Sequence, residues 1–429
     1  WSSGETTERL TTEALTIDSD FSVCFTNQSG MTTEQEFHIS IIDAVDDISI
    51  EGIRYLYNPY CGKFLLGSND WGTQASLGDT GIDFTISASG NGYTLDSKLN
   101  NGGNNQYLGS DLYLDNSSTI WCIAPSGTYD GKLTYTLTTD GSNYLSAPSS
   151  GNVAVGIPYS TDERAQWILY SQDELFAKMS DATPTHPMNA TFLLPGYNFG
   201  RNDTRNSQWQ GDPVIGGDNK NLNAEKFNTT FDVYQELTDI PNGTYEVSVQ
   251  AFYRYGGHGA DIAASARTSG TEVIHASIYA NGIETPVPSI FDCAGGCGEI
   301  GVSSTYGYVP NSQSDASAYM SSGLYWSQPI RVNVIDGTLR LGIMKSTTVT
   351  NDWTLFDNFR LMYLGRLLLN DINRDGLITI GDVSALISII LGKDSVEPYI
   401  YDHTAADINK DGSITVSDIS ALIKILLNK

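Results

Sequence analysis

The chain has 429 residues, of which 17% are charged and 10% aromatic, with 42 glycines and a formal net charge of −27. A chain of this length is too long for one ordinary core, so we expect about three domains. An acidic protein of this kind repels nucleic acid and anionic membranes, so we expect no binding to a nucleic-acid phosphate backbone. The low share of charged residues and the many Gly, Tyr, Asn, Ser and Thr residues are typical of a mainly β, secreted protein.

No apolar run reaches the ~18–20 residues that cross a bilayer, and no signal-peptide pattern opens the chain. The first residue is Trp1. We therefore expect a mature or trimmed product that is secreted or held at the cell surface.

The five cysteines cannot all pair with one another. Cys293 and Cys297 flank Ala-Gly-Gly, a segment flexible enough for a disulfide between them. We interpret Cys24, Cys61 and Cys122 as buried thiols.

Residues 1–47 contain short alternating stretches at 21–25 and 37–42, which predict a β-rich segment whose role the sequence does not define.

Residues 48–172 carry a weak threefold repeat. The segments 63–65, 106–108 and 143–145 each follow a Gly- or Asn-rich turn, and Phe64, Tyr107 and Tyr144 are 43 and 37 residues apart. Each copy ends on an apolar strand, at 84–86, 120–123 and 166–169. Three copies of a four-stranded unit of about 40 residues resemble a β-trefoil. That resemblance implies shallow sugar pockets in the lobes, and an inert spacer is the equal alternative.

Residues 173–189 predict a short helix followed by a Pro-rich linker, and therefore a domain boundary.

Residues 190–365 predict a second β domain. Strands are expected at 231–235, 243–254, 330–335, 339–343 and 356–363. Short strands between long Gly, Ser and Asn loops favour a two-sheet β-sandwich jelly roll. The segments 241–247 and 353–361 resemble the early and closing strands of the galactose-binding-like jelly roll of carbohydrate-binding modules. The resemblance implies Asp357 as an additional calcium ligand; alternatively, Asp357 only accepts hydrogen bonds within its strand.

Sugar binding uses aromatic rings that stack on pyranoses and planar polar groups that bond hydroxyls. The candidate side chains lie beside Gly, Asn or Ser in expected loops: Trp71, Trp209, Tyr253, Tyr255, His258 and Trp326. Trp121, Trp167 and Trp353 lie in apolar strands and are predicted to be core.

Residues 366–429 contain two acidic loops of twelve residues, 371–382 and 407–418, which begin 36 residues apart. Oxygen-bearing residues at positions 1, 3, 5, 7, 9 and 12 are the pattern that calcium prefers, with glycine at position 6 for a sharp turn. We expect two Ca²⁺ ions here, and the jelly-roll resemblance above implies a further one at Asp357. The predicted ligands are Asp371, Asn373, Asp375, Leu377, Thr379, Asp382, Asp407, Asn409, Asp411, Ser413, Thr415 and Asp418. An apolar-periodic stretch follows each loop, at 383–391 and 419–427, and predicts a helix.

The duplicated loop, the Asp at position 12 and the trailing helix resemble a type I dockerin, a calcium-folded module that docks onto a cohesin domain of another protein. By this resemblance the partner-facing residues are Ile380, Gly381, Val416 and Ser417. They are not the hydroxyl pairs typical of cellulosomal dockerins. The alternative is a stabilising calcium module that packs against its own chain.

No zinc-binding His-Glu-x-x-His, Gly-x-Ser-x-Gly elbow or phosphate loop is present. We therefore expect a protein that binds glycans and is not an enzyme. Its expected fold is mainly β, with a β-trefoil domain, a jelly-roll domain and a small helical calcium module at the C-terminus. The alternatives are a glycan-degrading enzyme with a carboxylate pair in residues 190–365, and a structural adhesin that recognises protein.

Overall fold

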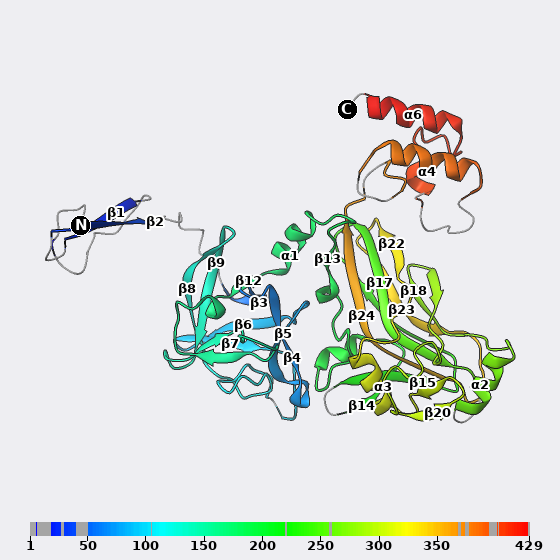
Figure 1. Cartoon of the computed structure of the whole chain (residues 1–429), viewed down its shortest axis with the longest axis horizontal. Helices are drawn as coiled ribbons and strands as arrows, with labels where there is room; N and C mark the ends of the chain where they lie inside the picture. Colours follow the sequence, from blue (N-terminus) through cyan, green and yellow to red (C-terminus); the bar gives the residue numbers. More distant parts are fainter. Residues whose placement is uncertain are drawn as a thin grey trace. The chain divides into compact units, whose positions relative to one another are not determined.

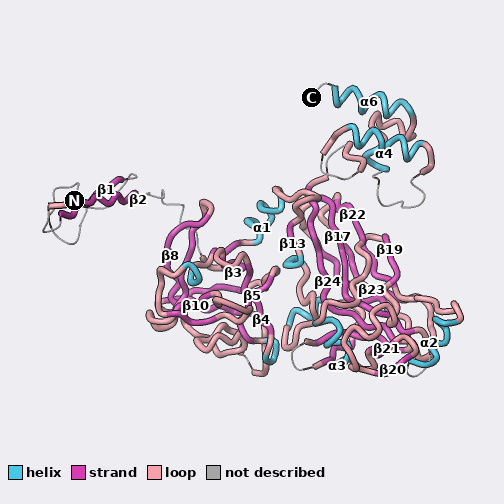
Figure 2. Tube along the Cα trace, in the orientation of Figure 1, coloured by secondary structure: helices cyan, strands magenta, loops and turns pink. Residues whose placement is uncertain are grey.

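A computed structural model describes residues 6, 19–26, 30–39, 50–103, 105–218, 221–256, 260–367, 370–373, 377–393, 401 and 403–427 (Figure 1). The chain divides into two compact units, residues 1–50 and 51–429. Strands dominate and helices are few, which confirms the mainly β expectation (Figure 2).

The first unit contains an antiparallel hairpin of β1 (Ser19–Thr26) and β2 (Thr32–Ile39). The second strand starts earlier than the predicted stretch at 37–42. Cys24 is exposed, so its interpretation as a buried thiol is wrong.

Ten strands form the β-rich part of residues 51–170. They are β3 (Gly52–Asn58), β4 (Lys63–Ser68), β5 (Gln74–Gly78), β6 (Phe84–Ser89), β7 (Gly92–Asp96), β8 (Cys122–Tyr129), β9 (Lys132–Thr138), β10 (Tyr144–Ser146), β11 (Val155–Ile157) and β12 (Ile168–Tyr170). Two short 3-10 turns, η1 (Asp70–Gly72) and η2 (Glu163–Ala165), interrupt them.

Six of these strands pair in a closed ring. β3 pairs with β6 and β12, β6 pairs with β7, and β8 pairs with β9. The two remaining contacts are reciprocal backbone hydrogen bonds: Tyr93 with Trp121, both 2.8 Å, and Tyr135 with Trp167, 2.7 and 2.9 Å. A closed ring leaves no unpaired sheet edge.

The sequence repeat has a packing counterpart in this ring. The indole N–H of Trp121 donates to the Leu108 carbonyl and that of Trp167 to the Leu145 carbonyl, each at 2.8 Å. Both leucines, like Leu65 in the first copy, are buried. The predicted core role of Trp121 and Trp167 is confirmed, because both indoles are also buried.

The predicted helix at 173–179 is α1 (Gln172–Met179). It begins with a capping box in which the Ser171 hydroxyl accepts from the Glu174 N–H and the Glu174 carboxylate accepts from the Ser171 N–H.

Residues 188–365 form two packed sheets. One has the order β14 (Val214–Gly217), β15 (Leu222–Phe227), β24 (Trp353–Gly365), β17 (Gly243–Arg254), β22 (Ile330–Val334), with β13 (Met188–Asn189) paired to β24. The other has the order β16 (Phe231–Leu237), β23 (Leu339–Lys345), β18 (Ser277–Ala280), β19 (Ile283–Pro286). The smaller elements are β20 (Val302–Ser304), β21 (Gly307–Val309), α2 (Ala260–Thr268), α3 (Gln313–Ser321), η3 (Thr191–Leu193) and η4 (Thr204–Gln208).

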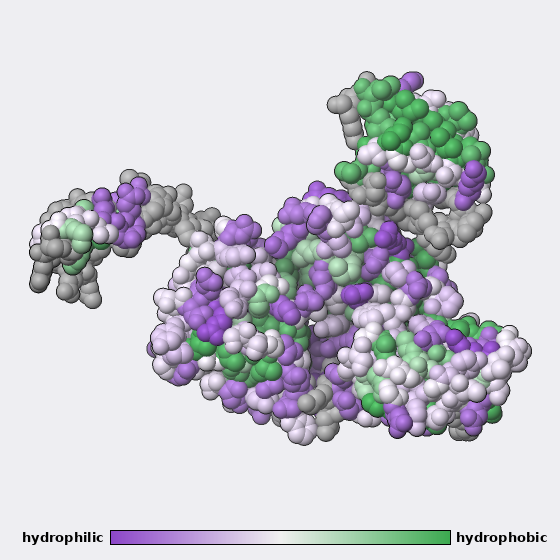
Figure 3. All heavy atoms as spheres, viewed as in Figure 1, coloured by the Kyte–Doolittle hydropathy of each residue, from purple (hydrophilic) through white to green (hydrophobic). Residues whose placement is uncertain are grey.

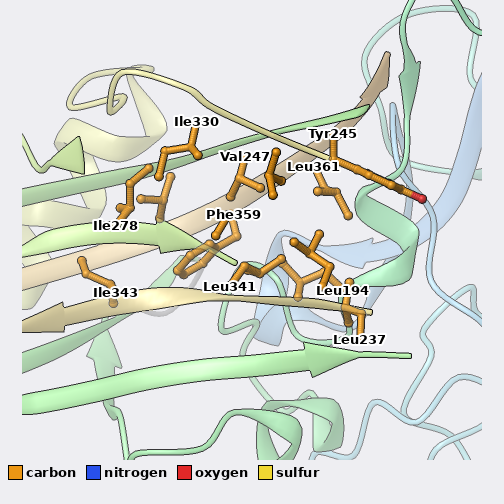
Figure 4. Packing of buried hydrophobic residues seen from close by; sticks show 14 of the residues in the cluster. Leu194, Leu237, Tyr245, Val247, Ile278, Ile330, Leu341, Ile343, Phe359 and Leu361 are labelled. Atoms are coloured by element: carbon orange, nitrogen blue, oxygen red, sulfur yellow. The ribbon is translucent and has the colours of Figure 1, made fainter. Parts of the chain in front are cut away.

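The core lies between these two sheets. Val247 and Leu361 from one sheet meet Ile278 and Leu341 from the other, all buried (Figure 4). Alternating apolar residues on the facing sides explain this packing. The opposite face of the larger sheet is covered in part by α3, whose Tyr319 packs in one buried cluster with residues of β17 and β24.

The two cysteines of the predicted disulfide, Cys293 and Cys297, are free thiols in this structure, so that prediction is wrong. Cys122 is exposed and Cys61 is half-buried, so neither is a fully buried thiol.

The C-terminal part contains α4 (Ile380–Ile390), α5 (His403–Ala406) and α6 (Val416–Leu427). Leu386 of α4 and Leu422 of α6 are fully buried in one small apolar cluster, which joins the two helices. Both predicted helices are confirmed, and each begins three residues before the predicted start.

Candidate functional site

In the first acidic loop, the side chain of Asp382 joins the two ends of the loop. Its Oδ1 accepts the N–H groups of Ile372 at 2.7 Å and Asn373 at 3.1 Å, and its Oδ2 accepts that of Thr379 at 2.7 Å. Thr379, at position 9, caps α4 by accepting the Gly381 N–H at 3.0 Å. The position-12 carboxylate is thereby buried and fixed; the position-5 ligand Asp375 lies outside the described residues.

The second loop repeats this arrangement. Asp418 Oδ1 accepts the Asn409 N–H at 3.1 Å and its Oδ2 accepts the Thr415 N–H at 2.8 Å. Burial raises the pKa of Asp418, but backbone N–H groups of Thr415, Asn409 and Ile408 outweigh it and hold this pKa below its ordinary value. The group is therefore ionised at neutral pH, as a calcium ligand must be.

The loop also folds around its first residue. Asp407 accepts the N–H groups of Asp411 at 3.1 Å and Gly412 at 2.9 Å, and Gly412 has a φ of +85°, which favours glycine. The atoms that would coordinate the metal at the predicted positions are oxygens, the ligand type that calcium prefers. Among the described residues no three His, Cys, Asp or Glu side chains converge as a ready metal cage. The Asp382, Asp407 and Asp418 carboxylates accept backbone N–H groups of their loops, and each carboxylate has further lone pairs with which it can coordinate a cation.

The predicted partner-facing residues lie in the first turns of α4 and α6. Ile380 is 71% exposed and Val416 is 65% exposed. The Ser417 hydroxyl lies 2.7 Å from the Thr415 hydroxyl and accepts the Asn409 amide at 3.0 Å, so it is held by its own loop. Figure 3 shows apolar residues gathered over these two helices. Ile387 of α4, Leu391 directly after it, and Ile423 and Leu427 of α6 are also exposed apolar side chains.

Three predicted sugar-binding rings are at least partly accessible. Trp71 is 50% exposed in η1, with the Arg201 guanidinium carbon 5.2 Å from its ring centroid. Trp326 is half-buried below Arg360, at 4.5 Å, and Tyr255 is half-buried and stacked on His275. The fourth candidate of this group, His258, lies outside the described residues.

Two predicted sugar-binding rings are buried and must be corrected to core residues. Trp209 is 4% exposed, donates its indole N–H to the Gly196 carbonyl at 2.9 Å and packs on Phe359. Tyr253 is 0% exposed and donates its hydroxyl to Asp352 at 2.8 Å. A ring without exposed area cannot stack on a sugar from solvent.

Asp357 is buried, and both its oxygens accept from Asn358: from the backbone N–H at 2.8 Å and from the side-chain amide at 3.0 Å. Burial raises its pKa well above the ordinary value, although the Asn358 N–H opposes this. Burial thus disfavours the charged form of this carboxyl, which is the form that coordinates calcium. These contacts favour the alternative, in which Asp357 only accepts hydrogen bonds within its strand.

Sequence reasoning missed a pocket at the ends of β15, β17 and β24, which is lined by Phe227 and Arg254 among others. The signal available was an aromatic residue directly before a polar turn, Asn228-Thr-Thr.

Residues 369–427 match the dockerin type I domain family. This part of the chain is a dockerin domain, and the match supports calcium binding and a cohesin partner for it. No curated protein matches the chain. A solved structure of the M60 catalytic domain with the CBM51-1 and CBM51-2 domains from Clostridium perfringens ZmpB is similar at 8% identity, with a TM-score of 0.18. The match covers 83% of this chain and 32% of the ZmpB chain, so this chain spans about a third of the length of the ZmpB chain. Within the described residues no helix is long and apolar enough to span a membrane.

Proposed function

We propose that this chain is an extracellular, non-catalytic glycan-binding protein that a two-calcium dockerin domain attaches to a cohesin-bearing partner. In this proposal the ring of residues 51–170 is a β-trefoil and the paired sheets of residues 188–365 are a galactose-binding-like jelly roll. The dockerin match is the single observation that carries the proposal, since such a module serves to attach what precedes it to an assembly. The pairing that closes the six-stranded ring supports the trefoil assignment, and the two facing sheets support the sandwich.

Glycan binding is tested on the full chain by isothermal titration against plant, host and microbial glycans. We expect heat of binding for at least one class and no change in the length of the glycan. Shortening of a polysaccharide in the same panel would favour the glycan-degrading alternative. Absence of binding to every glycan of the panel would count against sugar recognition and favour the alternative of an adhesin that recognises protein.

Attachment is tested at the first turns of the two helices. We expect the double substitution Ile380→Asp and Val416→Asp to weaken binding to a cohesin domain by at least a hundredfold. The reason is that two exposed apolar contacts become desolvated charges at an interface centre. The fold should persist, because an acidic side chain in the first turn of a helix is favourable.

Ile335→Asp is the matched control, because Ile335 is 73% exposed in another part of the chain. Surface plasmon resonance on immobilised cohesin measures affinity, and circular dichroism reports folding. Full affinity in a folded double variant would show that this face does not dock.

A further inference from the structure

Three neighbouring strands place a row of side chains on one face of the larger sheet. In the antiparallel register, Trp353 of β24 lies opposite Phe227 of β15 on one side and Arg254 of β17 on the other. Directly opposed residues point to the same face. Here the row stands at the ends of the strands, near the start of α3, which packs beside β15 (Figure 1).

This row borders a pocket of about 570 Å³, named here the Arg254 pocket. It is lined by Glu225, Phe227, Arg254, Asn311, Ser312, Gln313 and Trp353. Its volume is within the range of about 300–1,000 Å³ that small-ligand sites occupy.

Arg254 brings unused hydrogen-bonding capacity to this pocket. The residue is only 6% exposed, and its guanidinium carbon lies 5.0 Å from the Trp353 ring centroid. Among the described residues its side chain donates one hydrogen bond, to the Asn311 side-chain oxygen at 3.3 Å, and its Nε has no partner there. A guanidinium carries five N–H donors, and leaving them unpaired in a buried place is costly. An acceptor oxygen from a ligand would offset that cost.

The Glu225 carboxylate offsets the positive charge of Arg254 in this pocket, and this favours a neutral ligand. Its Oε2 accepts the Trp353 indole N–H at 2.7 Å, which fixes the carboxylate beside the pocket. One positive and one negative side chain nearly balance, so an anionic ligand would gain at Arg254 and lose at Glu225. A hydroxyl suits both groups, because it accepts from one and donates to the other.

Phe227 supplies the apolar surface. Its side chain is 43% exposed, in contrast to the buried ring of Trp353. An exposed ring beside converging planar polar groups is the combination that recognises a sugar, whose faces are apolar and whose rim is hydroxylated.

We propose that the Arg254 pocket binds a neutral pyranose unit of a glycan, with the sugar face on Phe227 and its hydroxyls between Arg254 and Glu225. This inference rests on the proposed glycan-binding function and assigns it a site. Neither Trp71 nor Trp326 lines this pocket.

The experiment compares the full chain with Phe227→Ala, Arg254→Gln and a matched control, Tyr306→Ala. Tyr306 is 40% exposed in the same β domain and lies outside the pocket. The probes are arabinogalactan, galactomannan and xylan as neutral glycans, with polygalacturonate as an acidic one, and binding is measured by titration calorimetry. We expect Phe227→Ala to weaken neutral-glycan binding about tenfold through loss of stacking, and Arg254→Gln by about tenfold or more.

Thermal melting checks that each variant is folded, and Phe227→Ala remains informative if the buried Arg254 cannot be replaced. Wild-type affinity in folded Phe227→Ala would overturn the pocket while leaving the glycan-binding function intact. If the chain bound polygalacturonate and none of the neutral glycans, the assignment of a neutral ligand would be wrong. Absence of binding by the unmodified chain to these probes and to every plant, host and microbial glycan of the panel above would overturn the proposed function and the pocket together.

Discussion

Removal of calcium is expected to unfold the C-terminal module while the two β-rich parts of residues 51–365 stay folded. When free calcium exceeds Kd about a thousandfold, each site stabilises the folded state by about 4 kcal/mol. A module of this size has a small core, so its total stability is near the low end of the usual range of about 5–15 kcal/mol. The stabilisation from two bound ions is therefore at least as large as the free energy of unfolding expected for the whole module. Without metal, the carboxylates of each loop also repel one another.

The measurement is far-ultraviolet circular dichroism of the full chain with EGTA and after calcium is restored. The helical signal should fall and return, since α4 and α6, at 11 and 12 residues, are the longest helices of the described chain. Asp407→Ala should lose part of this signal even in calcium, because Asp407 also accepts two N–H groups of its loop. Asp181→Ala, outside the loops, serves as the control. An unchanged spectrum and melting curve in EGTA would contradict the calcium assignment.

Lys345→Met is expected to destabilise the two-sheet part of the chain, residues 188–365, by about 3–5 kcal/mol, because it leaves a buried carboxylate without its cation. Lys345 and Asp352 form an ion pair, and both are almost completely buried. The Tyr253 hydroxyl donates to the same Asp352 oxygen at 2.8 Å, while the other oxygen has no hydrogen-bond partner among the described residues. Burial, together with this carboxylate, raises the pKa of Tyr253, so the hydroxyl remains a donor.

Thermal melting should place Lys345→Met roughly 10 °C below the unmodified chain. The double variant Lys345→Met with Asp352→Asn should recover much of this loss, since it removes both charges. Tyr253→Phe, which removes only one hydrogen bond, should cost about 1 kcal/mol. Equal melting temperatures for the single and double variants would show that the buried charge is not the cause.

The calcium loops were predictable because their chemistry is local. All six ligand positions of a loop fall within twelve residues, so spacing alone specifies the arrangement. The helix starts were predicted less well: α4 and α6 each begin three residues before the predicted start. Thr379, at position 9 of the loop, is also the N-cap of α4, so position 10 is already helical.

The aromatic rings show the limit of this reasoning. Trp209 and Tyr253 stand beside polar or Gly-rich segments, as Trp71 does, yet only Trp71 of these three is substantially exposed. Neighbours in sequence do not report which face of a sheet a ring occupies. In Tyr253 the side-chain alternation of β17 turns the ring toward the buried Asp352.

The sequence alone determined the paired acidic loops, the helices after them, the mainly β character and the threefold spacing of residues 48–172, because each depends on short-range periodicity or ligand order. Only the tertiary structure decided which rings meet solvent, that the six strands close on themselves, and that Phe227, Arg254 and Trp353 share one face. Strand register brings these distant residues together, and register depends on the packing of the whole sheet rather than on any local pattern.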